Sequence, residues 1–289
     1  MSIDHGPLFA ASEVFGFTIL PGRYQITERF DGLEHRFDLR VTDAGRRASS
    51  YTPVQSSKRI LLTGDSALFA WGLDDEESLP WLLQSRLPDY EVVNLTLTSY
   101  STIQALLQLR EIAPPVGPND IVVLVYHPVT NGFNVAEPVF LHNLKTGYEL
   151  QLGDAGMRDM NVPFGDIDAQ GNFAIRRIAL HCSDAASSPQ CHHPVLPPAA
   201  VTRVTERAFD EIAALHAGHL VVAFVSGSDD DPVIAHLKSH GFTIADLRTV
   251  DGVPETTDLI PTDLHAGAFW THQAYIRLLE ALQRNRLVD

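Results

Sequence analysis

The sequence predicts an α/β fold, a three-layer α/β/α sandwich with a five-stranded parallel sheet, preceded by a small β-rich N-terminal appendage. Two observations predict it. From about residue 58 onward, short apolar runs alternate with segments that carry apolar residues at helical spacing. Before that point apolar and polar residues alternate, which is typical of antiparallel strands. We therefore predict an appendage and connector at 1–57 and a main domain at 58–289.

The N-terminal appendage contains predicted antiparallel strands. Residues 15–30 and 35–45 alternate apolar with polar side chains, and an Asp-Gly turn signal separates them. Residues 46–58 are polar and are predicted to connect the appendage to the main domain. The appendage is short for an independent domain.

Five apolar runs predict the strands of the main domain. They are 59–64, 91–97, 120–127, 219–227 and 242–247. Helical spacing predicts helices at 77–87, 101–112, 205–218, 231–241 and 271–285. Because strands and helices alternate along the chain, we expect a parallel sheet with helices on both faces.

A long insertion, from about 132 to 200, breaks this alternation. It is rich in Gly, Pro, Asp and Asn and shows no clear strand–helix period. Structureless runs of this length are uncommon inside compact domains and are often functional. We predict a lid or pocket wall that sets substrate choice, with an oligomer contact as the alternative.

The insertion also contains the two cysteines of the chain, Cys182 and Cys191. His181, His192 and His193 are their neighbours, so the segment holds enough ligands for zinc, although the spacing matches no standard finger. A disulfide would close a short loop, but cytoplasmic thiols usually stay reduced. An irregular loop, a disulfide and a zinc site all stay open for this segment.

The charge of the chain restricts its partners. A formal net charge of −15 argues against nucleic acid, because phosphate binding needs clustered Lys and Arg. It also disfavours adhesion to anionic membranes. The N-terminus lacks a signal-peptide pattern, and no segment approaches the length of a membrane span. We expect a cytoplasmic protein without membrane insertion, and the sequence predicts no oligomeric state.

The run from Ile60 to Gly64 ends abruptly at Gly-Asp-Ser, and Ser66 opens a helical pattern. The serine is thus expected at the carboxyl end of a strand and at a helix N-terminus, where open α/β folds bind ligands. Asp65 and Ser66 are also good capping residues, so a helix cap alone is the other interpretation.

A reactive serine needs a base that takes its proton. Among thirteen histidines, His265 stands two residues after Asp263 and directly before the last predicted helix. A carboxylate at that distance can fix the imidazole tautomer and stabilise the imidazolium. His272 is the rival base, but it falls inside the helix.

Loops after the second and third predicted strands offer groups that could stabilise an oxyanion. These strands end in NLTLTSYST and VYHPVTNGF, where backbone N–H groups and Asn side chains lie at the same sheet edge as the serine. Each loop could also be ordinary turn chemistry.

Together these motifs resemble the SGNH (GDSL) hydrolases. Gly-Asp-Ser follows the first strand, Asn-bearing loops follow the second and third, and Asp-x-His precedes the last helix, in that order. The run GDSALFAWGLDDEESLPWLLQSRLPDYEVVNLTLTSYSTIQ is similar to the first and second sequence blocks of that family. The likeness covers roughly 58–131 and 240–289. It implies a flavodoxin-like sheet and a catalytic domain at 58–289 with the insertion at about 132–200.

The resemblance implies a role for each motif residue. Ser66 would be the nucleophile, His265 the general base and acid, and Asp263 the carboxylate that orients His265. The oxyanion hole would comprise the backbone N–H of Ser66, the backbone N–H of Ser99 and the side chain of Asn131.

Two departures from the family pattern concern this hole. Ser99 stands where the second block has glycine, which leaves the backbone less freedom. The third block reads YHPVTNGFN rather than Gly-x-Asn-Asp. Asn131 therefore comes late and without its aspartate, and Asn134 or His127 could take its role.

The sequence thus predicts a serine hydrolase that cleaves carboxylic esters, acyl or acetyl, through an acyl-serine intermediate. Its expected partner is a small-molecule ester or acylated substrate, and the mechanism requires no metal or organic cofactor. Two alternatives stay open. One is an acyltransferase that passes the acyl group to an alcohol or amine, and the other is a catalytically impaired binding domain on the same fold.

Overall fold

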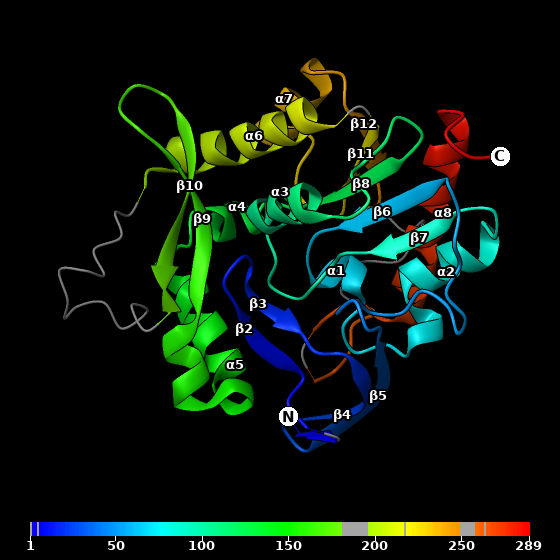
Figure 1. Cartoon of the computed structure of the whole chain (residues 1–289), viewed down its shortest axis with the longest axis vertical. Coiled ribbons are helices and arrows are strands. Elements are labelled where there is room, and N and C mark those ends of the chain that lie inside the picture. The colour runs from blue at the N-terminus through cyan, green and yellow to red at the C-terminus, as the bar shows by residue number, and fades with distance from the viewer. Residues whose placement is uncertain (1, 5, 181–195, 217, 249–257, 263) are drawn as a thin grey trace.

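The architecture is seen in a computed structural model (Figure 1). It describes residues 2–4, 6–180, 196–216, 218–248, 258–262 and 264–289. Cys182, Cys191 and their neighbouring histidines lie outside the described residues, as does Asp263.

The centre of the structure is a five-stranded parallel sheet, which confirms the predicted fold class. Its strands are β6 (Arg59–Thr63), β7 (Glu91–Asn94), β8 (Ile121–Tyr126), β11 (His219–Phe224) and β12 (Thr243–Asp246). The order β12-β11-β8-β6-β7 is the flavodoxin-like order, in which the first strand lies between the second and the third. The strand order reverses between β6 and β8, and the carboxyl ends of those two strands mark the expected ligand site.

Helices cover both faces of this sheet, as predicted (Figure 1). One face packs against α2 (Leu79–Arg86) and α8 (Ala268–Arg284). The other packs against α3 (Thr102–Glu111), α6 (Pro198–Leu215) and α7 (Pro232–Ser239). Neighbouring residues of β6 point into opposite layers, which is why its sequence is apolar throughout rather than alternating. No helix among the described residues is long and apolar enough to cross a bilayer.

The N-terminal segment forms antiparallel strands, as its alternating pattern predicts. β1 (Ser2–Asp4), β4 (Gly22–Phe30) and β5 (Leu33–Val41) make one sheet, and β2 (Phe9–Ser12) pairs with β3 (Gly16–Ile19). The predicted Asp-Gly turn joins β4 to β5, with positive φ at both Asp31 (48°) and Gly32 (78°). Two positive φ angles are typical of the tight hairpin turn that Asp-Gly favours.

The insertion is not a structureless run, which corrects that expectation. It contains α4 (Thr130–Asn134), α5 (Pro138–Asp159) and the antiparallel pair β9 (Asn161–Ile167) and β10 (Phe173–Ala179). α6 also begins earlier than predicted, at Pro198. The first half of α5 buries Phe140, Leu141, Leu144 and Tyr148, whose spacing follows one helix face. Whether the insertion acts as a lid or contacts another subunit stays a prediction.

The insertion and the N-terminal strands share a hydrophobic core. Phe9 and Phe17 of the N-terminal hairpin each contact Tyr148 of α5, with ring centroids 4.5 and 4.8 Å apart. The same cluster includes Phe69 and Trp71, which lie at and just after the helix that Ser66 begins. The two segments that precede and interrupt the main domain therefore pack on the residues following the serine.

Arg47 of the predicted polar connector is buried and hydrogen-bonded in the interior of the protein. The residue is 1% exposed, although it belongs to the segment predicted to be a polar connector. The guanidinium donates to Asp75 Oδ1 at 3.0 Å and to the carbonyl oxygens of Phe69, Ala70 and Leu73 at 2.6–2.7 Å. These carbonyls belong to the end of the short helix that carries the serine and to the residues after it. Arg47 thus satisfies groups that this helix cannot satisfy itself.

Replacing Arg47 with Ala is expected to lower the free energy of unfolding by about 3–5 kcal/mol, because the substitution leaves the Asp75 carboxylate buried without its charged partner. Urea unfolding monitored by circular dichroism measures the loss. Arg23→Ala is the matched control, since Arg23 is exposed on β4, and should change stability by less than about 0.5 kcal/mol. Equal effects of the two substitutions would contradict the role given to Arg47.

Candidate active site

Ser66 is the first residue of α1 (Ser66–Phe69) and is half-buried. The chain passes from β6 to α1 through Gly64, whose φ is +133°. A Cβ on Gly64 would lie 2.5 Å from Cβ of Val125 on β8, so only glycine fits this turn. The strand, turn and helix therefore place Ser66 at the carboxyl end of β6, as the sequence predicts.

Asp65 caps α1 and is buried beside the imidazole of His127. Its Oδ1 accepts the backbone N–H of Ala67 at 3.0 Å, and its other oxygen pairs with Nε2 of His127, the residue after β8. Burial alone would raise the pKa of the Asp65 carboxyl. The attraction of His127, its hydrogen bond, the Ala67 N–H and the charge of His265 outweigh burial and lower that pKa.

His265 lies in the loop before α8 and is half-buried. Its carbonyl accepts the N–H of Ile260 at 2.8 Å, and Leu264 N–H donates to the Ile260 carbonyl at 2.9 Å. Leu264 has a φ of +64°. The charge of His265 is among the causes that lower the pKa of the Asp65 carboxyl, the residue before Ser66. The rival base His272 is exposed on α8.

Ser99 lies in a turn that hydrogen-bonds to the Ser66 segment. Leu97 N–H donates to the Gly64 carbonyl at 3.0 Å, and Tyr100 N–H closes the turn on the Leu97 carbonyl at 3.1 Å. Ser99, the third residue of this turn, has a φ of +62°. This is the left-handed region that glycine adopts without strain, which gives a physical reason for the glycine expected here.

The insertion contacts the Ser99 turn through Tyr148 of α5. The Tyr148 hydroxyl lies 2.8 Å from Oγ1 of Thr98 and donates to the Thr98 carbonyl at 3.4 Å. Burial raises the pKa of Tyr148, so its hydroxyl stays protonated. A residue of the insertion therefore holds the loop from which an oxyanion donor was predicted.

The three side chains considered for the last oxyanion donor lie in different surroundings. Asn134 is fully buried and donates to Thr102 and Thr205, so its amide joins α4 to α3 and α6. Asn131 donates Nδ2 to the Tyr126 hydroxyl at 3.2 Å. His127, in contrast, is hydrogen-bonded to Asp65, the residue that precedes Ser66.

Two contacts that the sequence does not predict connect the N-terminal sheet to the site. Glu28 of β4 is 8% exposed and accepts the indole N–H of Trp71 at 2.7 Å and the Thr262 hydroxyl at 2.9 Å. Trp71 lies just beyond α1, and Thr262 lies in the loop of His265. One carboxylate therefore joins the segments that carry the serine and the histidine. No local signal marks Glu28, because its partners are more than 40 residues away in sequence.

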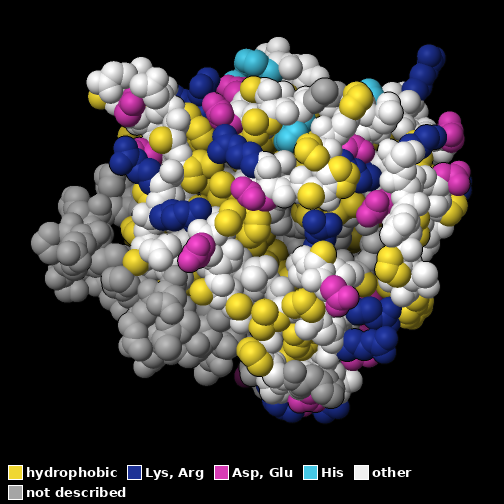
Figure 2. Space-filling view, in the orientation of Figure 1, with side chains coloured by type: hydrophobic (Ala, Val, Ile, Leu, Met, Phe, Trp, Pro, Cys, Tyr) yellow, Lys and Arg dark blue, Asp and Glu magenta, His cyan; other side chains and the backbone are white. Residues whose placement is uncertain are grey.

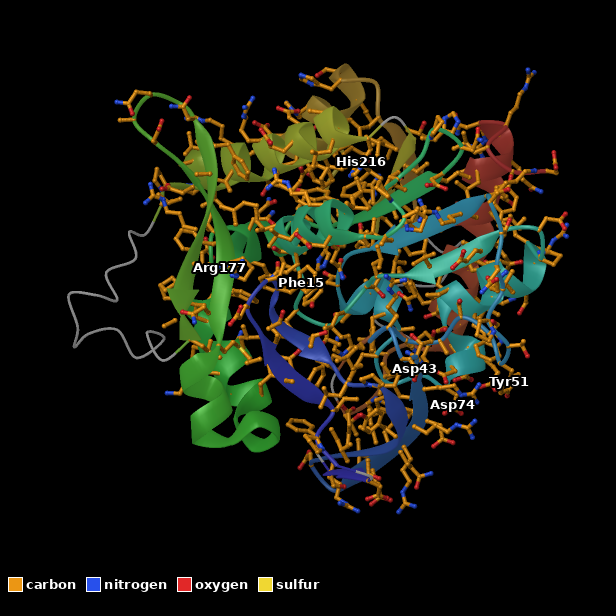
Figure 3. All side chains as sticks on the ribbon, viewed as in Figure 1. Phe15, Asp43, Tyr51, Asp74, Arg177 and His216 are labelled. Atoms are coloured by element: carbon orange, nitrogen blue, oxygen red, sulfur yellow. The ribbon has the colours of Figure 1, made fainter. Side chains whose placement is uncertain are left out.

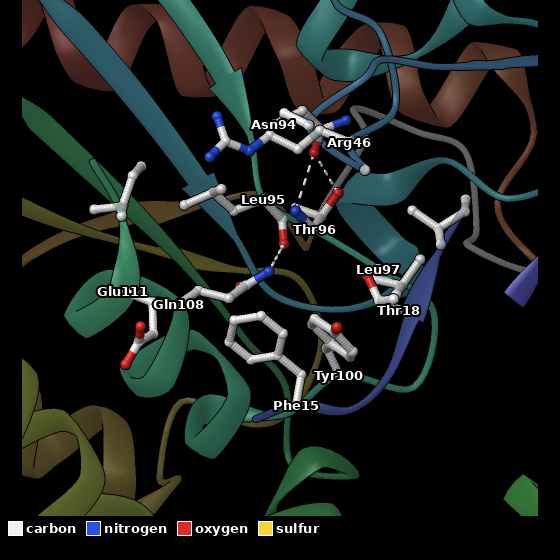
Figure 4. A pocket seen from close by; sticks show the side chains of 14 residues that line it. Phe15, Thr18, Arg46, Asn94, Leu95, Thr96, Leu97, Tyr100, Gln108 and Glu111 are labelled. Carbon is white, nitrogen blue, oxygen red and sulfur yellow. Dashed lines mark hydrogen bonds between the residues drawn. The ribbon is translucent and has the colours of Figure 1, made fainter. Parts of the chain in front are cut away.

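A pocket of about 200 Å³ lies between the β2–β3 hairpin and α3 (Figure 4). Phe15 lines it from the tip of the hairpin (Figure 3). Asn94 and Gln108 line it too, and their orientations are fixed by the N–H of Thr96 and the carbonyl of Leu95. The remaining atoms, Asn94 Nδ2 and Gln108 Oε1, are buried and have no partner among the described residues. Ser66 does not line this pocket.

Comparison with known proteins finds similarity in structure. No family model and no curated protein matches the chain. Among solved structures, it is similar to a member of the lipolytic protein G-D-S-L family from Veillonella parvula, with 11% identity, a TM-score of 0.45, and 79% of this chain and 100% of that chain covered.

Two further solved structures are similar to the chain. TesA has 16% identity and a TM-score of 0.42, with 80% of this chain and 99% of that chain covered. Axe2, an acetylxylan esterase from Geobacillus stearothermophilus, has 10% identity and a TM-score of 0.41, with 80% and 96% covered. At these identities the likeness is one of fold.

Substituting Ser99 with Gly is expected to raise the free energy of unfolding by about 0.5–1 kcal/mol, because glycine removes the left-handed strain of a side chain. Thermal and urea unfolding measure the change. Ser85→Gly is the matched control: Ser85 is exposed within α2, and glycine there should lower stability by about 0.5 kcal/mol. A stability loss in both variants would show that Ser99 is not strained.

Asp65→Asn is expected to lower the free energy of unfolding by about 1–3 kcal/mol at pH 7, because it removes a buried charge that His127 stabilises. The folded pKa of Asp65 lies below its unfolded value of about 3.9. Its stabilising contribution is therefore complete above that value and is lost as the pH falls through the folded pKa. Urea unfolding between pH 7 and 3 should show the gap to the wild type narrowing below about pH 4. Asp89→Asn, at an exposed position, should show no such gap.

Proposed function

We propose that this protein is a serine hydrolase of the SGNH type that cleaves small carboxylic esters through an acyl-Ser66 intermediate. The observation that carries the proposal is the position of Ser66. It begins α1 at the carboxyl end of β6, where the strand order reverses, and the preceding Asp65 interacts with both His127 and His265. Open α/β sheets bind ligands at this point.

In this mechanism the Ser66 hydroxyl attacks the ester carbonyl carbon while His265 accepts its proton. His265 then returns the proton to the leaving alcohol. In the second half, water attacks the acyl carbon while His265 accepts its proton, and that proton passes to the Ser66 oxygen as the carboxylic acid leaves. Asp263, which lies outside the described residues, is the proposed partner that orients His265. The hydrogen bonds of the His265 loop to Ile260 and of Thr262 to Glu28 support a defined position for the base.

The developing oxyanion would receive backbone N–H groups from Ser66 and Ser99. The hydrogen bond from Leu97 to Gly64 supports this pairing, because it joins the two loops beside each other. For the third donor we favour a ring N–H of His127 over Asn131 and Asn134. Asn134 donates within the helical layer and Asn131 donates to Tyr126, so neither amide is directed at the residues around Ser66. His127 is held there by the bond between its Nε2 and Asp65, and the donor we propose is the N–H at Nδ1 of a ring protonated at both nitrogens.

A fluorophosphonate probe followed by intact-protein mass spectrometry tests the proposal. The wild type should gain one adduct, Ser66→Ala none, and His265→Ala should react at least about a hundredfold more slowly because the base is lost. His272→Ala is the matched control, an exposed histidine on α8, and should react like the wild type. No adduct on folded wild type, or an adduct that persists in Ser66→Ala, would refute the serine mechanism.

The same assay ranks the candidate donors. His127→Ala should slow acylation of Ser66 by about a hundredfold, and it should also lower stability because it leaves the Asp65 carboxylate buried without its partner, whereas Asn131→Ala should slow acylation far less. The reverse order would assign the third donor to Asn131.

Turnover of an acetyl ester with and without an added alcohol separates hydrolysis from acyl transfer, because an acceptor changes the product but not the acyl-serine.

A further inference from the structure

We propose that Asp210, His236 and His240 form a binding site for a divalent transition-metal ion, Zn²⁺ by the chemistry of its ligands. One ligand atom from each residue lies within 4.8 Å of the other two. Asp210 belongs to α6, His236 to α7, and His240 is the residue that ends α7. Figure 2 shows histidine side chains gathered at the top of the molecule, where α7 lies in Figure 1.

This site is separate from Ser66. α7 leaves the carboxyl end of β11 and returns to the amino end of β12, so its last residues lie at the opposite edge of the sheet from the carboxyl end of β6. The proposal therefore stands independently of the hydrolase mechanism, and its failure would leave that mechanism untouched.

The two histidines present their rings to the same side of α7. Residues four apart face one way on a helix, and His236 and His240 stack with ring centroids 4.0 Å apart and planes 27° apart. A histidine pair at this spacing is the arrangement by which helices hold zinc. Nε2 of His236 is 2.8 Å from Oδ1 of Asp210, which supplies an oxygen from the neighbouring helix.

The tautomer of His240 suits metal binding. Its Nδ1 lies 2.9 Å from the carbonyl oxygen of His236, an atom that can only accept, so Nδ1 carries the hydrogen. The Ser239 hydroxyl donates to the same carbonyl and lies 3.0 Å from Nδ1, so its oxygen can accept that hydrogen as well. Nε2 of neutral His240 therefore keeps its lone pair. Metal-ligating histidines are commonly oriented by such a bond from the other ring nitrogen.

The ion would take the place of the proton between Asp210 and His236. Binding forms one metal–oxygen and two metal–nitrogen bonds; a neutral His236 then carries its hydrogen on Nδ1, whereas a protonated His236 releases one proton to solvent. Zinc bonds of about 2.0–2.1 Å keep tetrahedral ligand atoms about 3.3 Å apart, so the Asp210–His236 pair must widen slightly and His240 must come to that same distance from both. Arg207 lies 3.7 Å from the other oxygen, Oδ2, and leaves Oδ1 to the ion.

Two nitrogens and one oxygen favour Zn²⁺ over Mg²⁺ or Ca²⁺, which prefer oxygen ligands. Three protein ligands leave a fourth position to water. Because the ligands come from two helices, the bound ion would fasten the end of α7 to α6.

Equilibrium dialysis of Zn²⁺ against tag-free, chelator-treated protein tests the site, with thermal unfolding as the second readout. His240→Gln and Asp210→Asn should each lose one equivalent of zinc or bind it at least about tenfold more weakly. Zinc should raise the Tm of the wild type more than that of either variant. Mg²⁺ should not raise the Tm of any of these proteins. His142→Gln, an exposed histidine on α5, is the matched control and should behave like the wild type.

The design isolates this site. Cys182, Cys191 and their neighbouring histidines are present in every variant, so only the difference between variants reports on α6 and α7. Circular dichroism of the metal-free proteins establishes that the variants fold. Equal zinc binding by all four proteins, or none by the wild type, would overturn the proposal.

Discussion

The arrangement of the proposed site depends on how a helix of four residues is held at both ends. α1 is too short to be stable by its own hydrogen bonds. Asp65 accepts an N–H at its first turn, and Arg47 donates to carbonyls at its last. A carboxylate at the N-terminus and a guanidinium at the C-terminus also complement the helix dipole. Burying Arg47 costs desolvation, and its hydrogen bonds and ion pair with Asp75 offset that cost.

Segments outside the parallel sheet hold the loops around Ser66. Tyr148 of the insertion bonds to the Ser99 turn, and Glu28 of the N-terminal sheet bonds to Trp71 and Thr262. The sheet supplies the positions of the loops, as in other open α/β folds. The added segments supply contacts that restrict how each loop can move, because the side chains of Tyr148, Glu28 and Trp71 are all buried.

Much of the fold follows from sequence pattern, because buried parallel strands need unbroken apolar runs and their helices need a regular apolar stripe. The runs around Leu61, Val123 and Val222 each identify a strand in this way. α5 is not predicted from the sequence, because the Gly, Pro, Asp and Asn residues of the insertion obscure the helical spacing of its apolar residues. The spacing of Phe140 and Leu144 was the signal that could have found it.

The candidate site was predictable only in part. Ser66 follows from the junction of an apolar run with Gly-Asp-Ser, since strand and helix signals meet there. Arg47 and Glu28 do not follow, because a polar residue in a polar stretch carries no information about partners that tertiary folding brings to it. The pairing of His127 with Asp65 depends likewise on β6 and β8 being neighbours, which neither local sequence reveals.

The burial of Arg47 and Glu28 has a consequence for how this chain can be rearranged. A chain shortened to residues 58–289 would keep every strand of the parallel sheet and each residue proposed for the chemistry. It would nonetheless leave the carbonyls after α1, the Trp71 indole and the Thr262 hydroxyl without the groups that bind them. In modular terms, the N-terminal strands cannot be exchanged for those of another protein unless the replacement brings an arginine and a carboxylate to the same two places.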